Sequence, residues 1–150
     1  MGLEIERKFL VDAKKIPAQI LKNGEKISQG YLCTEPARTV RVRTKGQRGF
    51  LTIKSCNVGI VRKEFEYEIP MDDAKEMLKL CANTLEKIRY KISYAGKIWE
   101  IDIFEGRHAG LILAEVELNS ADEIVDVPEW IEIEVSTDPR YFNSNLALST

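Results

Sequence analysis

Two glutamates and a lysine near the start of the chain have a spacing that suits metal and phosphate chemistry. Glu4, Glu6 and Lys8 occupy alternate positions in the run from Leu3 to Val11. In an extended strand alternate side chains share one face, and neighbours on that face lie about 7 Å apart at Cα. Two carboxylates at that distance can converge on one divalent cation. We therefore expect a metal site here, with Lys8 facing the anion that the cation holds.

The same alternation of charged with mostly apolar residues recurs along the chain. The charged positions are Arg41, Arg43, Lys45, Lys54, Arg62, Glu64, Glu66, Glu68, Lys87, Arg89, Lys91, Glu100, Asp102, Glu115, Glu117, Glu132 and Glu134. One such strand is typical of an antiparallel sheet with a solvated face. About eight strands dominated by charges of both signs instead favour a closed barrel whose charged faces line a tunnel. The predicted fold class is α+β and mainly β: a closed eight-stranded antiparallel barrel with a few flanking helices.

Length and composition narrow the class of protein. A chain of 150 residues predicts one domain over residues 1–150. The net charge of −2 argues against a nucleic-acid polymer or a membrane surface as partner. No apolar run has the length of a membrane span or resembles a signal peptide, so we expect a cytoplasmic protein. Cys33, Cys56 and Cys81 form no Cys-x-x-Cys pair and are expected to be reduced, and the single His108 makes a histidine-based zinc site implausible.

Turn residues and apolar periodicity predict the order of the elements. Strands are expected near 3–11, 25–34, 37–45, 48–56, 59–69, 85–95, 97–105, 110–119 and 129–136. Helices are expected at 12–21, where Pro17 weakens the middle, from 72 or 73 to about 82, and after Pro139, with a short helix or loop at 120–127. These helices are too few to cover the outward apolar faces of a barrel. We therefore expect part of the outer surface to be shared in a homodimer.

The predicted tunnel has an acidic and a basic side. The acidic residues are Glu4, Glu6, Glu115, Glu117, Glu132 and Glu134, the basic residues are Arg41, Arg43, Lys54, Lys87 and Arg89, and Arg62 shares a strand with Glu64 and Glu66. Isolated buried charges cost several kcal/mol each unless they are paired or bound to metal. A polyphosphate with Mg²⁺ or Mn²⁺ satisfies both sides, since arginine binds phosphate oxygens in bidentate fashion and carboxylates bind the cation.

The sequence lacks the motifs of several other enzyme classes. There is no Gly-x-x-x-x-Gly-Lys-Ser/Thr loop, which excludes a P-loop nucleotide hydrolase. There is no Gly-x-Ser-x-Gly elbow and no plausible Cys/His nucleophile. Paired carboxylates also serve glycoside hydrolysis, but a neutral sugar has little use for so many arginines and lysines.

The ordered set of motifs resembles the CYTH superfamily, the triphosphate tunnel metalloenzymes. The segment Glu4-Ile-Glu-Arg-Lys8 looks like the Glu-x-Glu-x-Lys signature of that superfamily. Further similar motifs follow in order: Gly30-Tyr-Leu32, Arg41-Val-Arg43, Leu51-Thr-Ile-Lys54, Arg62-Lys-Glu-Phe-Glu66, Lys87-Ile-Arg89, Trp99-Glu-Ile-Asp102, Glu115-Val-Glu117, Glu132-Ile-Glu-Val135 and Arg140-Tyr-Phe-Asn143. One departure is Ser136, where relatives often have threonine, and it keeps the hydroxyl. The resemblance covers nearly the whole chain.

The resemblance implies a triphosphate-binding tunnel with divalent metal, Mg²⁺ or Mn²⁺, and it assigns roles to residues. It implies that Glu4, Glu6 and Glu134 hold the metal, and that Glu117 and Glu132 hold a second metal or orient the attacking water. Glu115 completes the set of metal-binding candidates. It implies that Lys8, Arg41, Arg43, Lys54, Arg62, Lys87 and Arg89 bind the phosphates. Tyr31, Lys87, Glu66 and Glu117 are the implied catalytic candidates. For each basic residue the alternative is a salt bridge to a lining glutamate, and for Tyr31 a packed or hydrogen-bonded side chain.

The resemblance leaves more than one activity open. Small bacterial tripolyphosphatases are the nearer match, which implies hydrolysis of inorganic tripolyphosphate to pyrophosphate and phosphate. The alternatives are a class IV adenylate cyclase, a thiamine or nucleoside triphosphatase, and a polyphosphate-binding module without catalysis. A cyclase needs an adenine pocket, and no segment of the sequence identifies one.

Overall fold

The computed structural model describes residues 2–148, which form a mainly β architecture with two short α-helices. The strands are β1 (Gly2–Val11), β2 (Glu25–Cys33), β3 (Arg38–Lys45), β4 (Arg48–Ser55), β5 (Val61–Ile69), β6 (Thr84–Tyr94), β7 (Lys97–Phe104), β8 (Ile112–Glu117) and β9 (Ile131–Glu134). The helices are α1 (Met71–Leu80) and α2 (Asn143–Leu148), with 3₁₀ turns η1 (Ala18–Ile20), η2 (Gly106–His108) and η3 (Pro139–Tyr141).

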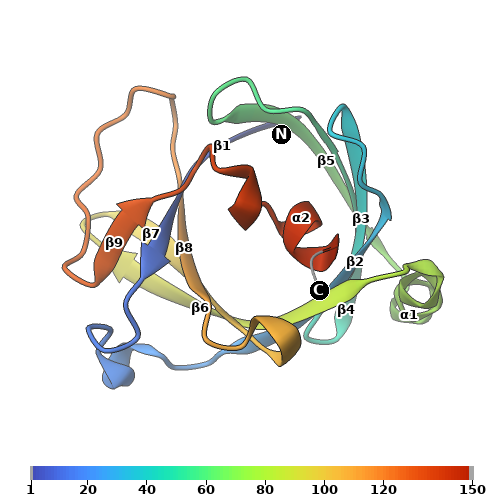
Figure 1. Cartoon of the computed structure of the whole chain (residues 1–150), viewed down its shortest axis with the longest axis horizontal. Helices are drawn as coiled ribbons and strands as arrows, with labels where there is room; N and C mark the ends of the chain where they lie inside the picture. Colours follow the sequence, from blue (N-terminus) through green and yellow to red (C-terminus); the bar gives the residue numbers. More distant parts are fainter. Residues whose placement is uncertain (1, 149–150) are drawn as a thin grey trace.

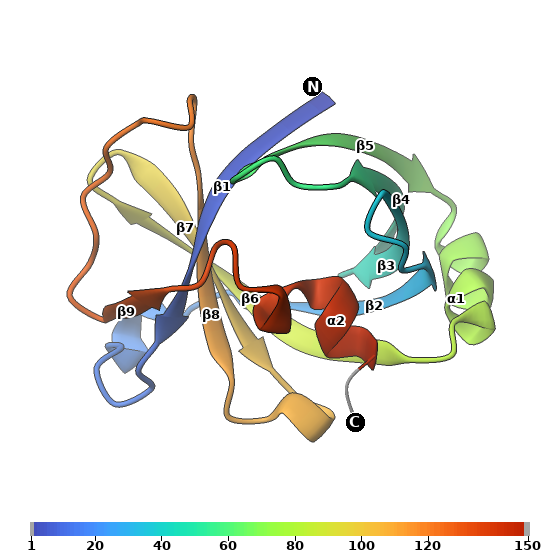
Figure 2. The same ribbon diagram turned by 45° about the horizontal axis from the view of Figure 1, so that its top comes forward.

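Eight of these strands close into an antiparallel barrel. The hydrogen-bonded order is β5-β4-β3-β2-β6-β7-β8-β1, and β1 pairs back onto β5 to complete the ring. The closing contact joins residues 2–5 to residues 61–64. Strand β9 is an addition outside the ring, attached to β1 at Phe9 and Val11 across a register shift. The ring is seen in Figures 1 and 2, and the predicted eight-stranded barrel is confirmed.

The main apolar core lies outside the barrel wall. It consists of Phe9, Trp99, Ile101, Ile112, Ala114, Val116, Leu118 and Trp130. Trp99 is fully buried, with its ring 5.6 Å from that of Phe9 and 6.3 Å from that of Trp130. Because side chains alternate along each strand, these outward residues leave their charged neighbours on β1, β7 and β8 facing the interior.

A second, smaller apolar cluster closes one end of the barrel from within. Leu85, Phe104 and Leu113 come from inward positions of β6, β7 and β8, and Leu146 and Ala147 of α2 pack on them. Figure 1 shows α2 lying across the ring of strands. The lumen therefore changes from charged to apolar where the C-terminal helix packs against it.

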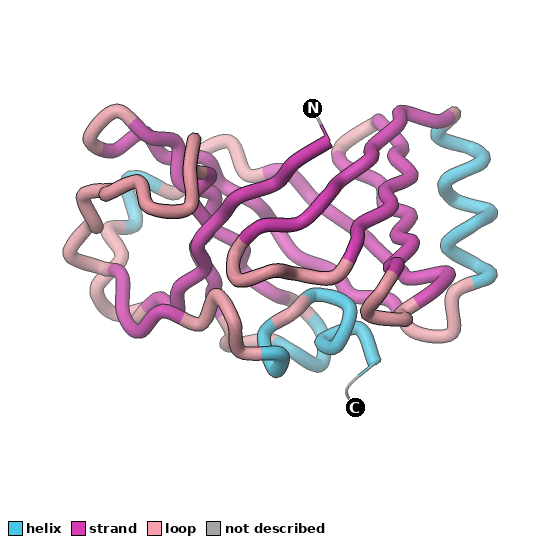
Figure 3. Tube along the Cα trace, turned by 90° about the horizontal axis from the view of Figure 1, so that it is seen from above, coloured by secondary structure: helices cyan, strands magenta, loops and turns pink. Residues whose placement is uncertain are grey.

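Helix α1 covers part of the outer surface. Figure 3 shows α1 alongside the strands, outside the ring. Gly49 allows its close approach, since a Cβ at Gly49 would lie 2.6 Å from the Cβ of Ala74. Other parts of the outer face remain open: Leu3, Ile53, Phe65 and Tyr67 are exposed on β1, β4 and β5.

One of the predicted helical segments differs from the structure. The expected helix at 12–21 is reduced to the 3₁₀ turn η1, because Pro17 has an extended backbone (ψ 126°) and supplies no amide hydrogen. The segment 120–127, expected as a short helix or loop, is turn and loop. The expected helix after Pro139 is present as η3 and α2. Within residues 2–148 no helix is long and apolar enough to cross a membrane.

Candidate active site

The barrel encloses a polar cavity of about 230 Å³. It is lined by Glu4, Glu6, Arg41, Arg43, Lys45, Lys54, Arg62, Glu64, Glu66, Arg89, Glu100, Glu115, Glu117 and Asn143. All of these except Asn143 carry an ionisable group. The alternation in seven strands, β1 and β3 to β8, therefore converges on one charged lumen.

Glu4 joins the acidic and the basic sides of this lumen. Its carboxylate accepts from Lys54 Nζ at 2.8 Å and from Arg62 Nε at 2.9 Å. Burial raises the pKa of Glu4, but the two cations outweigh it and lower that pKa to about 2. Glu4 is thus a permanent anion at neutral pH.

Glu6 and Glu115 form a close pair of carboxyl groups on β1 and β8. Burial raises the pKa of Glu6 well above its usual value, and the neighbouring Glu115 and Glu4 raise it further. Burial also opposes ionisation of Glu115, but Lys8 and a hydrogen bond from Glu6 hold the pKa of Glu115 well below normal. The pair therefore shares one proton, as two crowded carboxyls in a buried site must.

The basic side is built around Arg41 and Arg43 of β3. Both guanidinium groups reach Glu66 Oε1, at 3.5 and 3.2 Å, and Thr52 donates to the same oxygen at 2.9 Å. Burial is the main cause that lowers the pKa of Arg43 to about 10, and repulsion from Arg41 and Arg89 lowers it further. Arg41 Nε and Arg43 Nε are buried donors without an acceptor among the described residues. An anion in the lumen would supply those acceptors.

Asp102 anchors the basic residues of β6. It lies 2.7 Å from Lys87 Nζ and accepts from Arg89 Nε at 2.7 Å. Burial lowers the pKa of Lys87 to about 8, against the opposing effect of Asp102. Lys87 also donates to Asn143 Oδ1 at 3.2 Å, so it lies where the charged lumen meets α2.

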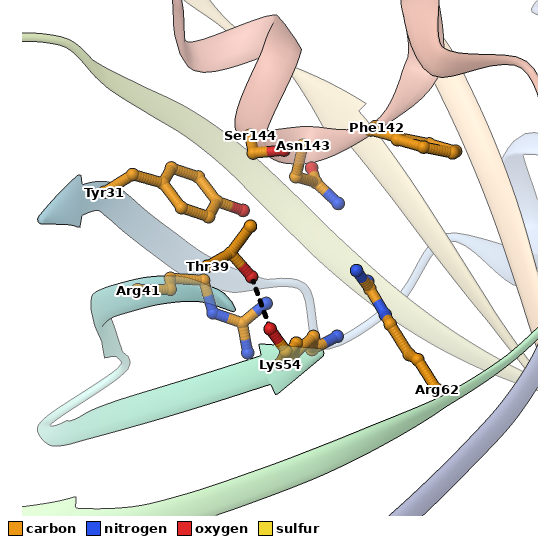
Figure 4. Close-up of a pocket in the computed structure, with 8 residues that line it drawn as sticks. All are labelled: Tyr31, Thr39, Arg41, Lys54, Arg62, Phe142, Asn143 and Ser144. Atoms are coloured by element: carbon orange, nitrogen blue, oxygen red, sulfur yellow. Dashed lines mark hydrogen bonds between the residues drawn. The ribbon is translucent and has the colours of Figure 1, made fainter. Parts of the chain in front are cut away.

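The cavity is approached from two sides. Beyond Arg89, an open hollow is lined by Lys22, Asn23, Gly24, Glu25 and Lys91. On the α2 side, a smaller pocket is lined by Tyr31, Thr39, Arg41, Lys54, Arg62, Phe142, Asn143 and Ser144. Figure 4 shows Tyr31, Arg41 and Arg62 converging on this smaller pocket from different strands.

The structure brings together most of the residues expected at the site. Glu4, Glu6, Glu66, Glu115, Glu117, Arg41, Arg43, Lys54, Arg62 and Arg89 line the main cavity. Tyr31 lines the smaller pocket, and Lys8 lines a side opening next to Glu4 and Glu6 while its Nζ donates to Tyr141 O. Lys87 is fully buried behind them.

Glu132 and Glu134 are the exceptions, since both lie outside the lumen. Glu134 pairs with Arg7 at 2.7 Å, and Arg7 points outward because it alternates with Glu6 and Lys8. Glu132 lies 3.9 Å from Lys15. Their placement follows from β9, which pairs with β1 beyond the closed ring and across a register shift. The expectation that they line the tunnel is therefore corrected.

Asp102 and Asn143 are site residues to which the sequence alone assigned no role, although both belong to the motifs that resemble the CYTH superfamily. Asp102 occupies a charged position in the alternating run Trp99–Ile103. Its role as a buried counter-ion, however, depends on Lys87 and Arg89 across the β6–β7 pairing. Asn143 enters the lumen only because α2 packs into one end. No local pattern carries that information.

The carboxyl groups of the lumen have the chemistry of a divalent-metal site. Among residues 2–148 no three acidic, histidine or cysteine side chains already converge as a ligand cluster. Yet Glu6 and Glu115 crowd each other in a buried site, and Glu4 and Glu117 line the same cavity. A cation would relieve that repulsion with the hard oxygen ligands that Mg²⁺ and Mn²⁺ accept. The residues present therefore fit such a metal.

A closed barrel with a lumen of paired acidic and basic walls defines a tunnel protein for a polyanionic ligand. Comparison with known proteins agrees, since the CYTH domain model matches residues 2–145. The chain belongs to the CYTH domain family.

Two curated relatives are both named inorganic triphosphatase. The one from Acetivibrio thermocellus is 44% identical over 148 residues, covering 97% of this chain and 94% of the relative. The one from Nitrosomonas europaea is 36% identical over 156 residues, covering 97% of each. A crystal structure of the inorganic triphosphatase NE1496 superposes with a TM-score of 0.70 at 34% identity, covering 100% of this chain and 97% of that one.

Replacing Glu6 by glutamine should stabilise the metal-free protein at neutral pH. Because the native pKa of Glu6 is raised, the folded state binds more protons than the unfolded state, and stability falls as pH rises through that native pKa. Glu6→Gln removes this penalty, which is about 1.4 kcal/mol per unit of pKa shift. Each kcal/mol gained should raise Tm by about 2–4 °C.

The measurement is thermal unfolding between pH 5 and 8 with a chelator present. Glu117→Gln is the matched control, because it neutralises an exposed carboxylate that lines the same cavity. A Glu6→Gln protein that melts below the wild type across this range would show that the Glu6–Glu115 pair is not strained.

Proposed function

We propose that this protein hydrolyses inorganic tripolyphosphate to pyrophosphate and phosphate in its charged lumen, with Mg²⁺ or Mn²⁺. The observation that carries the proposal is the pair of buried donors Arg41 Nε and Arg43 Nε, which lack an acceptor among the described residues. Both arginines line a cavity whose other lining residues are almost all charged. The names of the relatives from Acetivibrio thermocellus and Nitrosomonas europaea support the same activity.

The metal is assigned to the acidic side of the lumen. Glu4, Glu6 and Glu115 would hold it, with Glu117 next to Glu6 across the β1–β8 pairing. A bound divalent cation would neutralise charge on the phosphate oxygens and polarise the attacking water. Glu132 and Glu134 have no part in this assignment, because they face away from the lumen.

The basic side binds and orients the triphosphate. Arg41 and Arg43 of β3 offer guanidinium donors in the wall of the cavity, and Lys54 and Arg62 extend this surface toward the α2 end. Arginine binds phosphate oxygens in bidentate fashion, whereas lysine contributes a point charge. Arg89 in the cavity lining adds positive charge next to Glu100 and Glu115, and the buried Lys8 and Lys87 add more. Tyr31 offers a hydroxyl at the α2 end.

Glu117 is the better candidate for the general base than Glu66. The Glu66 carboxylate already accepts from Thr52 and the two arginines. Burial raises the pKa of Glu66, but these three partners outweigh burial and lower that pKa below its usual value. Glu117 lines the cavity, and its carboxylate forms no ion pair with another described residue. In the proposed step a water proton passes to this base as the water oxygen bonds to the terminal phosphorus. The bridging P–O bond then breaks, and pyrophosphate leaves.

Product analysis separates the proposed activity from its alternatives. With Mg²⁺ or Mn²⁺ and tripolyphosphate, we expect equal amounts of phosphate and pyrophosphate, and little product from ATP offered in parallel.

Arg41→Ala should lower kcat/KM roughly 100-fold, as loss of one donor to developing charge does elsewhere. Arg48→Ala is the control, since Arg48 is an exposed arginine paired with Glu68 outside the cavity. Cyclic AMP from ATP would replace the proposal with the cyclase, and triphosphate binding without turnover would replace it with a binding module.

The rate of tripolyphosphate hydrolysis should depend on the charge of Lys87. Because the pKa of Lys87 is lowered to about 8, its ammonium group loses the proton as pH rises through that value. The constant kcat/KM reports groups of the free enzyme, so it should fall above pH 8. Lys87→Arg keeps the charge and should move this fall to higher pH. A wild-type profile that stays flat through pH 8 to 10 would remove Lys87 from the reaction.

We also propose that the protein forms a homodimer through the face of Leu3, Ile53, Phe65 and Tyr67, and that it works in the cytoplasm. These side chains occupy neighbouring register positions on β1, β5 and β4, and all four are exposed. A second copy offers the same exposed apolar surface, as a two-fold interface requires. Phe65→Glu should convert a dimer to a monomer in sedimentation velocity, whereas Ile124→Glu, on a distant exposed loop, should not. A monomeric wild type at high micromolar concentration would contradict the dimer.

A further inference from the structure

Gln29 is a fully buried amide on the inward face of β2, and neither the metal site nor the phosphate site uses it. Its Nε2 donates to Tyr31 Oη at 3.2 Å. The two residues share a face because they are two apart on one strand. The other polar atom of the amide, Oε1, is buried and has no partner among the described residues.

This hydrogen bond fixes what the Tyr31 hydroxyl can do. A phenol has one proton to donate and lone pairs that accept. When the oxygen accepts from Gln29, its own proton must point elsewhere. Figure 4 shows the Tyr31 hydroxyl directed into the pocket that it shares with Arg41, Lys54 and Arg62. Within residues 2–148 it donates no hydrogen bond to a protein acceptor.

We propose that Gln29 is a positioning residue that holds Tyr31 as a hydrogen-bond donor to a phosphate oxygen of the substrate. The proposal rests on the proposed function, since it needs a phosphate between Tyr31 and the neighbouring cations. Gln29 acts only through Tyr31 and does not reach the substrate itself.

The buried, unpartnered Oε1 argues against a merely structural role for Gln29. A buried amide with an unpartnered carbonyl is less stable than an apolar side chain of similar shape. Methionine has nearly the same length and no such group. Gln29→Met should therefore leave Tm unchanged or raise it, whereas loss of a structural hydrogen bond would lower it.

A double-mutant cycle tests the proposal. Gln29→Met is expected to lower kcat/KM for tripolyphosphate roughly five- to tenfold, the effect of one hydrogen bond. Tyr31→Phe should lower it at least as much and with the same division between kcat and KM. The double variant should behave like Tyr31→Phe alone, because Gln29 has no further effect once the hydroxyl is gone. Ile27→Met is the matched control: it alters a fully buried position on the same face of β2, and its activity should stay within about twofold.

Three results would overturn the inference. The first is a loss of kcat/KM in the double variant equal to the product of the two single losses. The others are unchanged activity in Gln29→Met and an activity loss that follows a lowered Tm. Calorimetric binding of tripolyphosphate without divalent metal gives a second readout of the same cycle. If the wild type binds tripolyphosphate but does not hydrolyse it, the proposed function fails while the binding cycle still decides the role of Gln29. If hydrolysis is intact and Gln29→Met is indistinguishable from wild type in both readouts, only the role of Gln29 fails.

Discussion

The barrel depends on the mutual neutralisation of charges that its closure buries. Closing β1 onto β5 places acidic and basic side chains from seven strands around one small cavity. Each such group would cost several kcal/mol if it were buried alone. The cost is offset in pairs, most completely where Asp102 lies between Lys87 and Arg89 and where Glu4 lies between Lys54 and Arg62. The positions where pairing is incomplete are the ones at which a ligand has something to stabilise.

The β-structure and the identity of the lumen residues were accessible from the sequence because the strand repeat is local. Alternation in a run such as Val40–Arg43 predicts both the strand and which side chains face inward, without knowledge of the partner strand. All nine predicted strands are present, and ten of the proposed site residues line the main cavity. The resemblance to the CYTH superfamily added the identity of the ligand, which alternation alone does not specify.

The parts that escaped prediction depend on contacts between distant segments. Glu134 alternates as regularly as Glu117, yet the register shift that attaches β9 to β1 turns Glu134 toward Arg7 on the outer surface. Asn143 reaches the lumen because Leu146 and Ala147 pack on Leu113 and its neighbours at one end of the barrel. Neither placement follows from a short window of sequence.

The position of the main apolar core outside the barrel wall has a consequence for how the strands find their alignment. Each of β1, β7 and β8 carries charges on the inner face and core residues such as Phe9, Trp99 and Val116 on the outer face. A slip of one residue in any of them would move the charges into the core and the aromatic rings into the lumen. A one-residue misalignment is therefore penalised on both surfaces of the sheet at once, and the fold selects its own alignment against it.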